Sequence, residues 1–326
     1  MMIMRNVLLL LMLIVFSAIY GQTVPSNYEN IAHLMTFGPG ADVKWGDDDN
    51  TQIYFFTVPK SFKKNIYIRV LDPSTSGEMD QANGSFDTRT EFAVYGGRGA
   101  YSNDAARNMN PIKGFDSGIL LDRKVFGSES KYDNEYYTFG PFNPKEGEYI
   151  PPQDDKDDPR YYFKIIIKGI SGNDGNGYKL ELSTSPDRLI PIEPSEAFSY
   201  EISFRLKEQK GSENIAHFYP FIEKGVTNVK QSNFDFDSNG KIFITSVVKN
   251  MHLATSSGDG VWQSSIHPIK EEEHNSVLDV QIVKNSDSQN DMVIFMENQY
   301  GEALPFYSLP SGYLKKYKYK VKITID

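Results

Sequence analysis

The chain has 326 residues, with 43 acidic against 34 basic side chains, a formal net charge of −9 and no cysteine. Nucleic-acid binding depends on neutralising phosphates, so this acidic balance without a long basic stripe argues against a nucleic-acid partner. The lack of cysteine excludes disulfides and thiol chemistry.

The first 21 residues have the pattern of a secretory signal peptide. Arg5 precedes the apolar run 7–16, which is short for a membrane span, and small residues at 17–21 favour cleavage before Gln22. The chain has no second apolar run of spanning length. We therefore expect an exported protein, periplasmic, on the cell surface or extracellular, with no transmembrane segment in the mature chain. An uncleaved N-terminal anchor is the alternative.

Strand patterns dominate the rest of the chain. Alternating β-branched and aromatic residues, separated by clusters of Gly, Asn, Asp and Pro, predict strands over residues 52–58, 65–71, 90–96, 161–169, 178–184, 200–206, 241–248, 277–283, 291–297 and 319–325. Residues 104–109 support at most one short helix. The basic stretch KKYKYKVK, residues 315–322, suits an edge strand whose lysines discourage aggregation. The sequence thus predicts an all-β fold of antiparallel strands.

A domain boundary is expected at residues 185–196, SPDRLIPIEPSE. The three prolines of this window cannot donate to a β-ladder, so it should be a connector. The mature chain is also longer than one hydrophobic core usually accommodates. We therefore predict two tandem antiparallel β-sandwich domains of jelly-roll type, residues 22–184 and 197–326, joined by the linker 185–196 after a cleaved signal peptide, residues 1–21.

The first half has a distinctive order of strand motifs. YFFTVPKS and IYIRVLDP are followed by TEFAVYGG, then by GEYIPP and by YYFKIIIKGISGNDGNGYKLELS. Over about residues 50–184 this order resembles the pre-peptidase C-terminal type of β-sandwich found in secreted bacterial proteins. The resemblance implies a non-catalytic, jelly-roll-like module, often calcium-stabilised, that helps secreted enzymes to bind polymers or to remain folded.

Two features depart from that family. No peptidase is attached, and the turn after Leu71 is longer than in a minimal version. The second half contains NFDFDSNGKIFITSVVKN and MVIFMENQYGEALPFYSLP, and it resembles uncharacterised secreted proteins of Bacteroidetes type. That likeness implies no activity.

The long turn after Leu71 is the first candidate metal site. Its acidic residues are Asp72, Glu78, Asp80 and Asp87. Calcium takes six to eight oxygen ligands, and an irregular loop between strands can supply them while the ion offsets the repulsion between carboxylates. The alternative is a solvated loop whose aspartates cap turns through backbone amides. Three aspartates at 47–49 could complete the same site or another.

DFDSNGKI, residues 235–242, is a weaker candidate. Asp235, Asp237 and Asn239 match the start of an EF-hand calcium loop. However, Ser246 stands where that motif needs a bidentate Glu, and a strand pattern follows where it needs a helix. The sequence therefore favours a hairpin turn, with calcium as a second interpretation. The glycine-rich residues 172–177 also predict a hairpin connection.

No catalytic signature is present. The chain has no G-x-S-x-G elbow, no H-E-x-x-H pair and no phosphate-binding glycine loop. Polymer contact is instead suggested by aromatic residues expected in turns: Trp45, Tyr101, Tyr132, Tyr136, Tyr137, Tyr149, Trp262 and Tyr300. Core packing is the alternative for each of them.

We therefore predict a secreted, non-enzymatic, calcium-stabilised binding or adhesion protein of the cell envelope. Its ligand is expected to be a polysaccharide or an envelope protein. Two alternatives stay open at this point: a glycan-active hydrolase that uses paired carboxylates, and a structural subunit of an envelope assembly.

Overall fold

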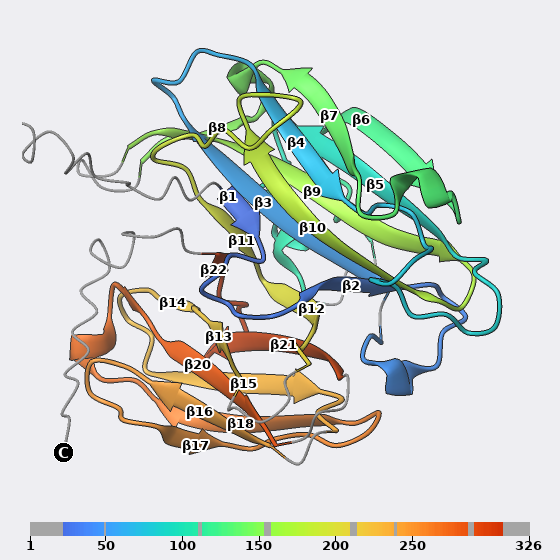
Figure 1. Cartoon of the computed structure of the whole chain (residues 1–326). Helices are drawn as coiled ribbons and strands as arrows, with labels where there is room; N and C mark the ends of the chain where they lie inside the picture. Colours follow the sequence, from blue (N-terminus) through green and yellow to red (C-terminus); the bar gives the residue numbers. More distant parts are fainter. Residues whose placement is uncertain are drawn as a thin grey trace, which may run out of the picture.

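The computed structural model describes residues 22–48, 50–109, 113–152, 158–208, 214–237, 240–285 and 290–308. In this part the predicted all-β fold is confirmed, since the strands pair antiparallel and the helices are single 3-10 turns (Figure 1). Within the described residues, none of the helical turns has the length and the apolar character of a membrane-spanning segment. The predicted signal peptide, the predicted strand 319–325 and the basic stretch 315–322 lie outside the described residues.

The elements follow one another closely along the chain. The first half forms the strands β1 (Gln22–Val24), β2 (His33–Phe37), β3 (Thr51–Pro59), β4 (Ile66–Leu71), β5 (Arg89–Gly96), β6 (Ile119–Phe126), β7 (Tyr136–Phe142), β8 (Glu148–Ile150), β9 (Arg160–Ser171), β10 (Gly175–Ser183) and β11 (Ala197–Ser199). The second half forms β12 (Glu201–Arg205), β13 (Asn214–Phe218), β14 (Phe221–Ile222), β15 (Asn228–Phe234), β16 (Lys241–Thr245), β17 (His252–Ala254), β18 (Trp262–Pro268), β19 (Ser276–Val277), β20 (Asp279–Lys284), β21 (Asp291–Asn298) and β22 (Phe306–Ser308). The 3-10 turns are η1 (Val43–Trp45), η2 (Asp104–Arg107), η3 (Ser130–Tyr132), η4 (Pro144–Glu146) and η5 (Glu271–Glu273).

One long sheet runs through the whole molecule. Its strand order is β18-β15-β21-β12-β2-β10-β4-β7, with β1 also paired to β10. The two halves of the chain meet where β12 pairs with β2, in the register Phe204↔Leu34 and Arg205↔His33. In Figure 1 this sheet passes from the lower lobe, which holds β12 to β21, into the upper lobe, which holds β1 to β11 and β22. We call these the C-lobe and the N-lobe.

Two further sheets cover the long sheet and complete a sandwich-like lobe at each end. In the N-lobe the partner sheet has the order β22-β11-β3-β9-β5-β6, with β8 beside β9. In the C-lobe it has the order β13-β20-β16-β17. Residues 184–196 contain neither helix nor strand, but β12 joins one sheet of the first half and β11 and β22 join the other. The predicted division into two tandem domains is therefore not confirmed.

The core follows from the period-two patterning of the strands. In β4 the alternate residues Ile66, Ile68 and Val70 are fully buried, as side chains on one face of a half-covered strand should be. A single apolar cluster extends from these residues to Phe204 and Phe218 beyond the predicted boundary. Each fully buried aliphatic or aromatic side chain contributes about 2 to 3 kcal/mol, so this continuous core stabilises both lobes together.

Two predicted hairpins are wrong. Residues 172–177 join β9 to β10, but β9 pairs with β3, β5 and β8, whereas β10 pairs with β1, β2 and β4. Residues 235–240 join β15 of the long sheet to β16 of the C-lobe partner sheet. Both connections cross between facing sheets. Asn, Asp and Gly residues indicate that the chain reverses direction. Whether the two flanking strands pair with each other depends on strands that are remote in sequence.

Candidate metal centre

The turn after β4 buries the carboxylate of Asp72. Asp72 is 0% exposed and adopts φ 56°, a left-handed conformation that Asp tolerates better than most residues. Its backbone N–H donates to the Glu135 carbonyl at 2.9 Å, which fixes the start of the turn. No side chain among the described residues donates a hydrogen bond to Oδ1 or Oδ2, although the Asn134 backbone N–H acts on the carboxylate as a donor. A buried carboxylate usually has more partners than this, so Asp72 is a candidate ligand for a cation.

Three further buried oxygens, two on the same turn and one on β10, lack hydrogen-bond partners among the described residues. They are Ser74 Oγ, Thr75 Oγ1 and Asn176 Oδ1. Asn176 belongs to β10, and its amide nitrogen donates to the Pro73 carbonyl at 3.0 Å, which fastens the strand to the turn. We call Asp72, Ser74, Thr75 and Asn176 the Asp72 chamber. Every unpartnered side-chain atom of this group is an oxygen, the donor type that calcium and magnesium prefer.

The electrostatics of the chamber disfavour negative charge. Burial raises the pKa of Asp72 to about 7, with the charge of Asp133 adding to the effect and the Asn134 N–H opposing it. Burial likewise raises the pKa of Asp80 to about 9, and the charges of Asp72 and Asp133 contribute. The charges of these carboxyls therefore interact, although they come from two separate loops and do not form a close group of the kind found at Asp235, Asp237 and Asp259. A bound cation would lower the pKa values of both carboxyls, because it favours their ionised forms.

The predicted acidic set is only partly brought together. Asp80 lies beside the chamber, where its Oδ1 accepts from the Gly177 N–H at 2.7 Å and its Oδ2 from the Ser76 N–H at 2.6 Å. Glu78 is exposed. Asp87 is also exposed, and its Oδ1 accepts from the Asn173 N–H at 3.3 Å. The structure thus places Asp72 and Asp80 where the charge of Asp133 acts on both of them, and it leaves Glu78 and Asp87 at the surface.

Asp174 is an organising residue that sequence reasoning missed. It is fully buried in the connection between β9 and β10. Its carboxylate accepts from the backbone N–H groups of Asn83 at 2.8 Å, Asp87 at 2.8 Å and Thr88 at 3.0 Å. Burial alone would raise the pKa of Asp174, but these donors outweigh it and hold that pKa below its usual value. Asp174 therefore anchors the far end of the turn that begins at Asp72.

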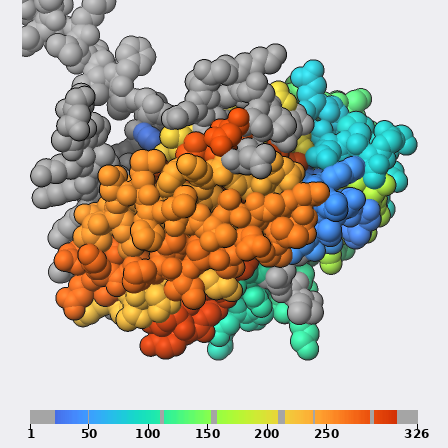
Figure 2. All heavy atoms as spheres, turned by 90° about the horizontal axis from the view of Figure 1, so that it is seen from below, coloured from blue at the N-terminus to red at the C-terminus, as the bar shows by residue number. Residues whose placement is uncertain are grey.

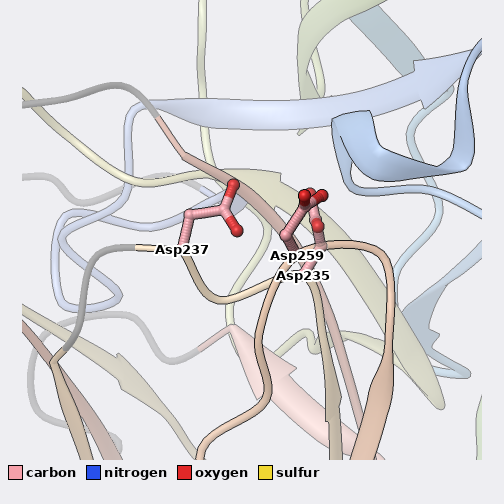
Figure 3. Close-up of side chains that lie close together, drawn as sticks. All are labelled: Asp235, Asp237 and Asp259. Atoms are coloured by element: carbon pink, nitrogen blue, oxygen red, sulfur yellow. The ribbon is translucent and has the colours of Figure 1, made fainter.

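A second acidic group lies where the two lobes meet. Asp235 and Asp237 follow β15, and Asp259 comes from the loop before β18. One carboxylate oxygen from each lies within 4.8 Å of the others, so the three could hold a metal ion (Figure 3). Burial raises the pKa of Asp235 to about 7, and the charges of Asp237, Asp259 and Asp291 contribute. Asn239, the remaining residue predicted for this site, lies outside the described residues.

This second group is already partly compensated. Asp235 Oδ1 accepts from the Gly260 N–H at 2.5 Å, and Asp259 pairs with Lys44 at 3.3 Å. Lys44 belongs to the early loop of the N-lobe, and Figure 2 shows these first residues in blue beside the orange atoms of the C-lobe. In the same region the Trp262 indole donates to Asp48 at 2.6 Å. Asp237 and Asp259 are exposed, so water can hydrate their carboxylates when no cation is bound.

Most of the aromatic candidates are held by other side chains. Tyr101 stacks on Tyr162 with the ring centroids 4.2 Å apart, and the Tyr136 hydroxyl donates to Glu181 at 2.7 Å. Tyr149 is 41% exposed, but the Lys60 Nζ lies over its ring, 4.6 Å from the centroid. Tyr300 is 78% exposed, so it offers an open ring for contact with a polymer.

One serine and histidine pair occurs on β18. Ser265 Oγ lies 2.9 Å from His267 Nε2. Burial lowers the pKa of His267 to about 4, and its Nδ1 has no hydrogen-bond partner in the described chain. A catalytic pair needs a third group that orients the imidazole. The pair on β18 lacks this group within the described residues.

No protein-family model matches this chain, and no curated protein matches it. The resemblance of residues 50–184 to the pre-peptidase C-terminal type of sandwich therefore stays a prediction.

Proposed function

We propose that this protein is an exported, non-catalytic binding or adhesion protein of the cell envelope whose N-lobe is stabilised by calcium. The observation that carries the proposal is Asp72, a fully buried carboxylate to which no side chain among the described residues donates a hydrogen bond. An ionised carboxylate in that position costs several kcal/mol unless a positive charge compensates it. Its pKa of about 7 means that either a proton or a bound cation removes this cost, and the oxygen-rich surroundings favour a cation.

The donor set favours calcium over other cations. The chamber offers carboxylate, hydroxyl and amide oxygens, and the chain has no cysteine to attract a softer metal. Its oxygens lie on an irregular turn and on one strand, an arrangement that the flexible coordination of calcium accepts better than the strict octahedron of magnesium. Asp80 can add a further carboxylate, since its charge interacts with that of Asp72.

Calcium binding would serve the function by ordering a long loop. The turn from Asp72 to Thr88 is anchored at its far end by Asp174, and the ion would fix its near end. Rigid loops cost less entropy when they bind a partner. The partner is expected to be a polysaccharide or an envelope protein, and the exposed ring of Tyr300 suits contact with a sugar face.

Calorimetric titration of the mature protein with calcium tests the proposal. The wild type and the exposed-site control Glu78→Gln should both release or absorb heat, whereas Asp72→Asn should lose this binding. Asp259→Asn reports on the second acidic group, and it should leave the Asp72-dependent binding unchanged. Equal calcium binding by the wild type and by Asp72→Asn would refute the proposal.

The binding role is tested separately with immobilised polysaccharides. We expect retention in calcium and weaker retention in chelator, with no sugar released from the column. Release of sugar would identify a glycan-active enzyme and reject the non-catalytic function.

A further inference from the structure

The Asp72 chamber is followed by a segment that reaches toward the other lobe. Asp80 holds this segment on the N-lobe through the N–H groups of Ser76 and Gly177. Gln81 forms a β-bridge with Gly175, with both hydrogen bonds 2.9 Å long. Residues 76–81 therefore lie along the start of β10, next to the residue Asn176 that lines the chamber.

Arg205 of β12 binds this segment from the C-lobe side. The side chain is 3% exposed, and its Nε and Nη2 donate to the two carboxylate oxygens of Asp291 at 2.7 and 2.6 Å. Its other contacts cross to the N-lobe loop: Nη2 donates to Gln81 Oε1 at 2.8 Å, and Nη1 donates to the Met79 carbonyl at 3.3 Å. We call these two crossing contacts the Arg205 clamp.

The clamp lies at the joint between the lobes. Arg205 is paired with His33 of β2, in the short ladder through which the long sheet passes from one lobe to the other. On the other side, a second N-lobe loop, which contains Gly46, approaches Asp291 so closely that a Cβ at Gly46 would lie 2.5 Å from the Asp291 carbonyl carbon. The buried ion pair is therefore enclosed by loops of the N-lobe, and its geometry depends on where those loops lie.

We infer that cation binding in the Asp72 chamber controls how firmly the two lobes are joined. The inference rests on the proposed function, because it requires an ion in the chamber. Without the ion, the side-chain oxygens of Ser74 and Thr75 have no hydrogen-bond partner among the described residues, so the turn that continues into residues 76–81 is held less firmly. With the ion, the segment is held on β10 and presents both acceptors to Arg205, so β12 is fixed against β2.

Hydrogen exchange of the full mature chain, followed by mass spectrometry with and without calcium, tests this coupling. In the wild type, calcium should slow exchange in residues 76–81 and also in β12 and β2. We expect a slowing of about tenfold at β12, since one hydrogen bond to a charged group changes an opening equilibrium by about that factor. The exposed-site variant Glu78→Gln should behave as the wild type.

Gln81→Ala separates the coupling from the binding. This variant removes the 2.8 Å acceptor of the clamp but none of the chamber oxygens. It should bind calcium as the wild type does and keep the protection of residues 76–80, while the protection of β12 is reduced at least about threefold. Calcium binding without any change at β12 in the wild type would overturn the inference and leave the proposed function standing. Persistence of full β12 protection in Gln81→Ala would overturn it as well, and the absence of calcium binding in the wild type would overturn both.

Discussion

Replacing Asp72 by Asn should stabilise the calcium-free protein. The folded-state pKa of Asp72 is raised from its ordinary 3.8 to about 7. Each pH unit between these values corresponds to about 1.4 kcal/mol, so the ionised carboxylate costs about 4 kcal/mol at most, because local rearrangement and water entry reduce the cost. Asn has nearly the same shape and tolerates φ 56°, and its amide can donate to the unpartnered oxygens of the chamber.

Thermal unfolding at pH 8 in a chelator measures this effect. At about 2 °C per kcal/mol for a chain of this size, Asp72→Asn should unfold up to about 8 °C above the wild type. In calcium the difference in melting temperature between the variant and the wild type should shrink or change sign. The reason is that an ion at a hundred times its Kd stabilises the wild type by about 2.7 kcal/mol and has no effect on the variant. A variant that is less stable than the wild type in chelator would refute the reasoning, since it would show that the carboxylate is well solvated or paired.

Further predictions concern pH, the anchor of the turn and one glycine. Calcium should raise the melting temperature more at pH 8 than at pH 5. The folded-state pKa values of Asp72 and Asp80 lie above the unfolded ones, so stability without the ion falls as the pH rises from about 4 through 7 to 9. Equal shifts in melting temperature at both pH values would contradict this prediction. Asp174→Ala should lower the unfolding free energy in urea by about 3 kcal/mol or more, since three backbone N–H groups lose their acceptor; an unchanged midpoint would exclude the anchoring role. Gly172→Ala should cost about 3 kcal/mol or more, because φ is +88° and a Cβ would lie 2.3 Å from the Thr88 Cα. The matched control Gly225→Ala, with φ +92° and open space, should cost about 1 kcal/mol in the same urea titration; similar losses in both would show that the close approach is unimportant.

Strongly periodic strands could be predicted from the sequence. The alternation in β4 indicates both the element and its buried face, because burial on one side imposes a period of two. The continuous β-branched run of β9 indicates a strand that is buried on both faces. Strands with a weaker pattern could not. β15 buries Gln231, Ser232 and Asn233, and Asn233 is satisfied by the Thr255 carbonyl at 2.8 Å, a partner from a distant loop. β7 carries the Gly140–Pro141 step, which is atypical of a strand interior.

The candidate metal centre shows the same limit. Charge density in the sequence points to the turn that contains Asp72 and Asp80, since acidic residues so close together need an explanation. The partners Asn176 and Asp133 belong to other segments, and only the fold brings them to the turn. Likewise, Asp259 joins Asp235 and Asp237 from a loop more than twenty residues away. Glu78 is exposed and Asp72 is buried, and this difference depends on the packed structure and not on the local amino-acid sequence.

The pairing of β22 with β11 has a consequence for the way the chain acquires its structure. β11 lies between β3 and β22, so a strand from residues 306–308 completes a sheet whose other members come mostly from the first two hundred residues. Closing the long loop between β11 and β22 is slow, because the chain loses conformational entropy before the final contacts form and stabilise it. The N-lobe sheet therefore reaches its final pairing only after residues 306–308 have been synthesised, about a hundred residues after its neighbour β11.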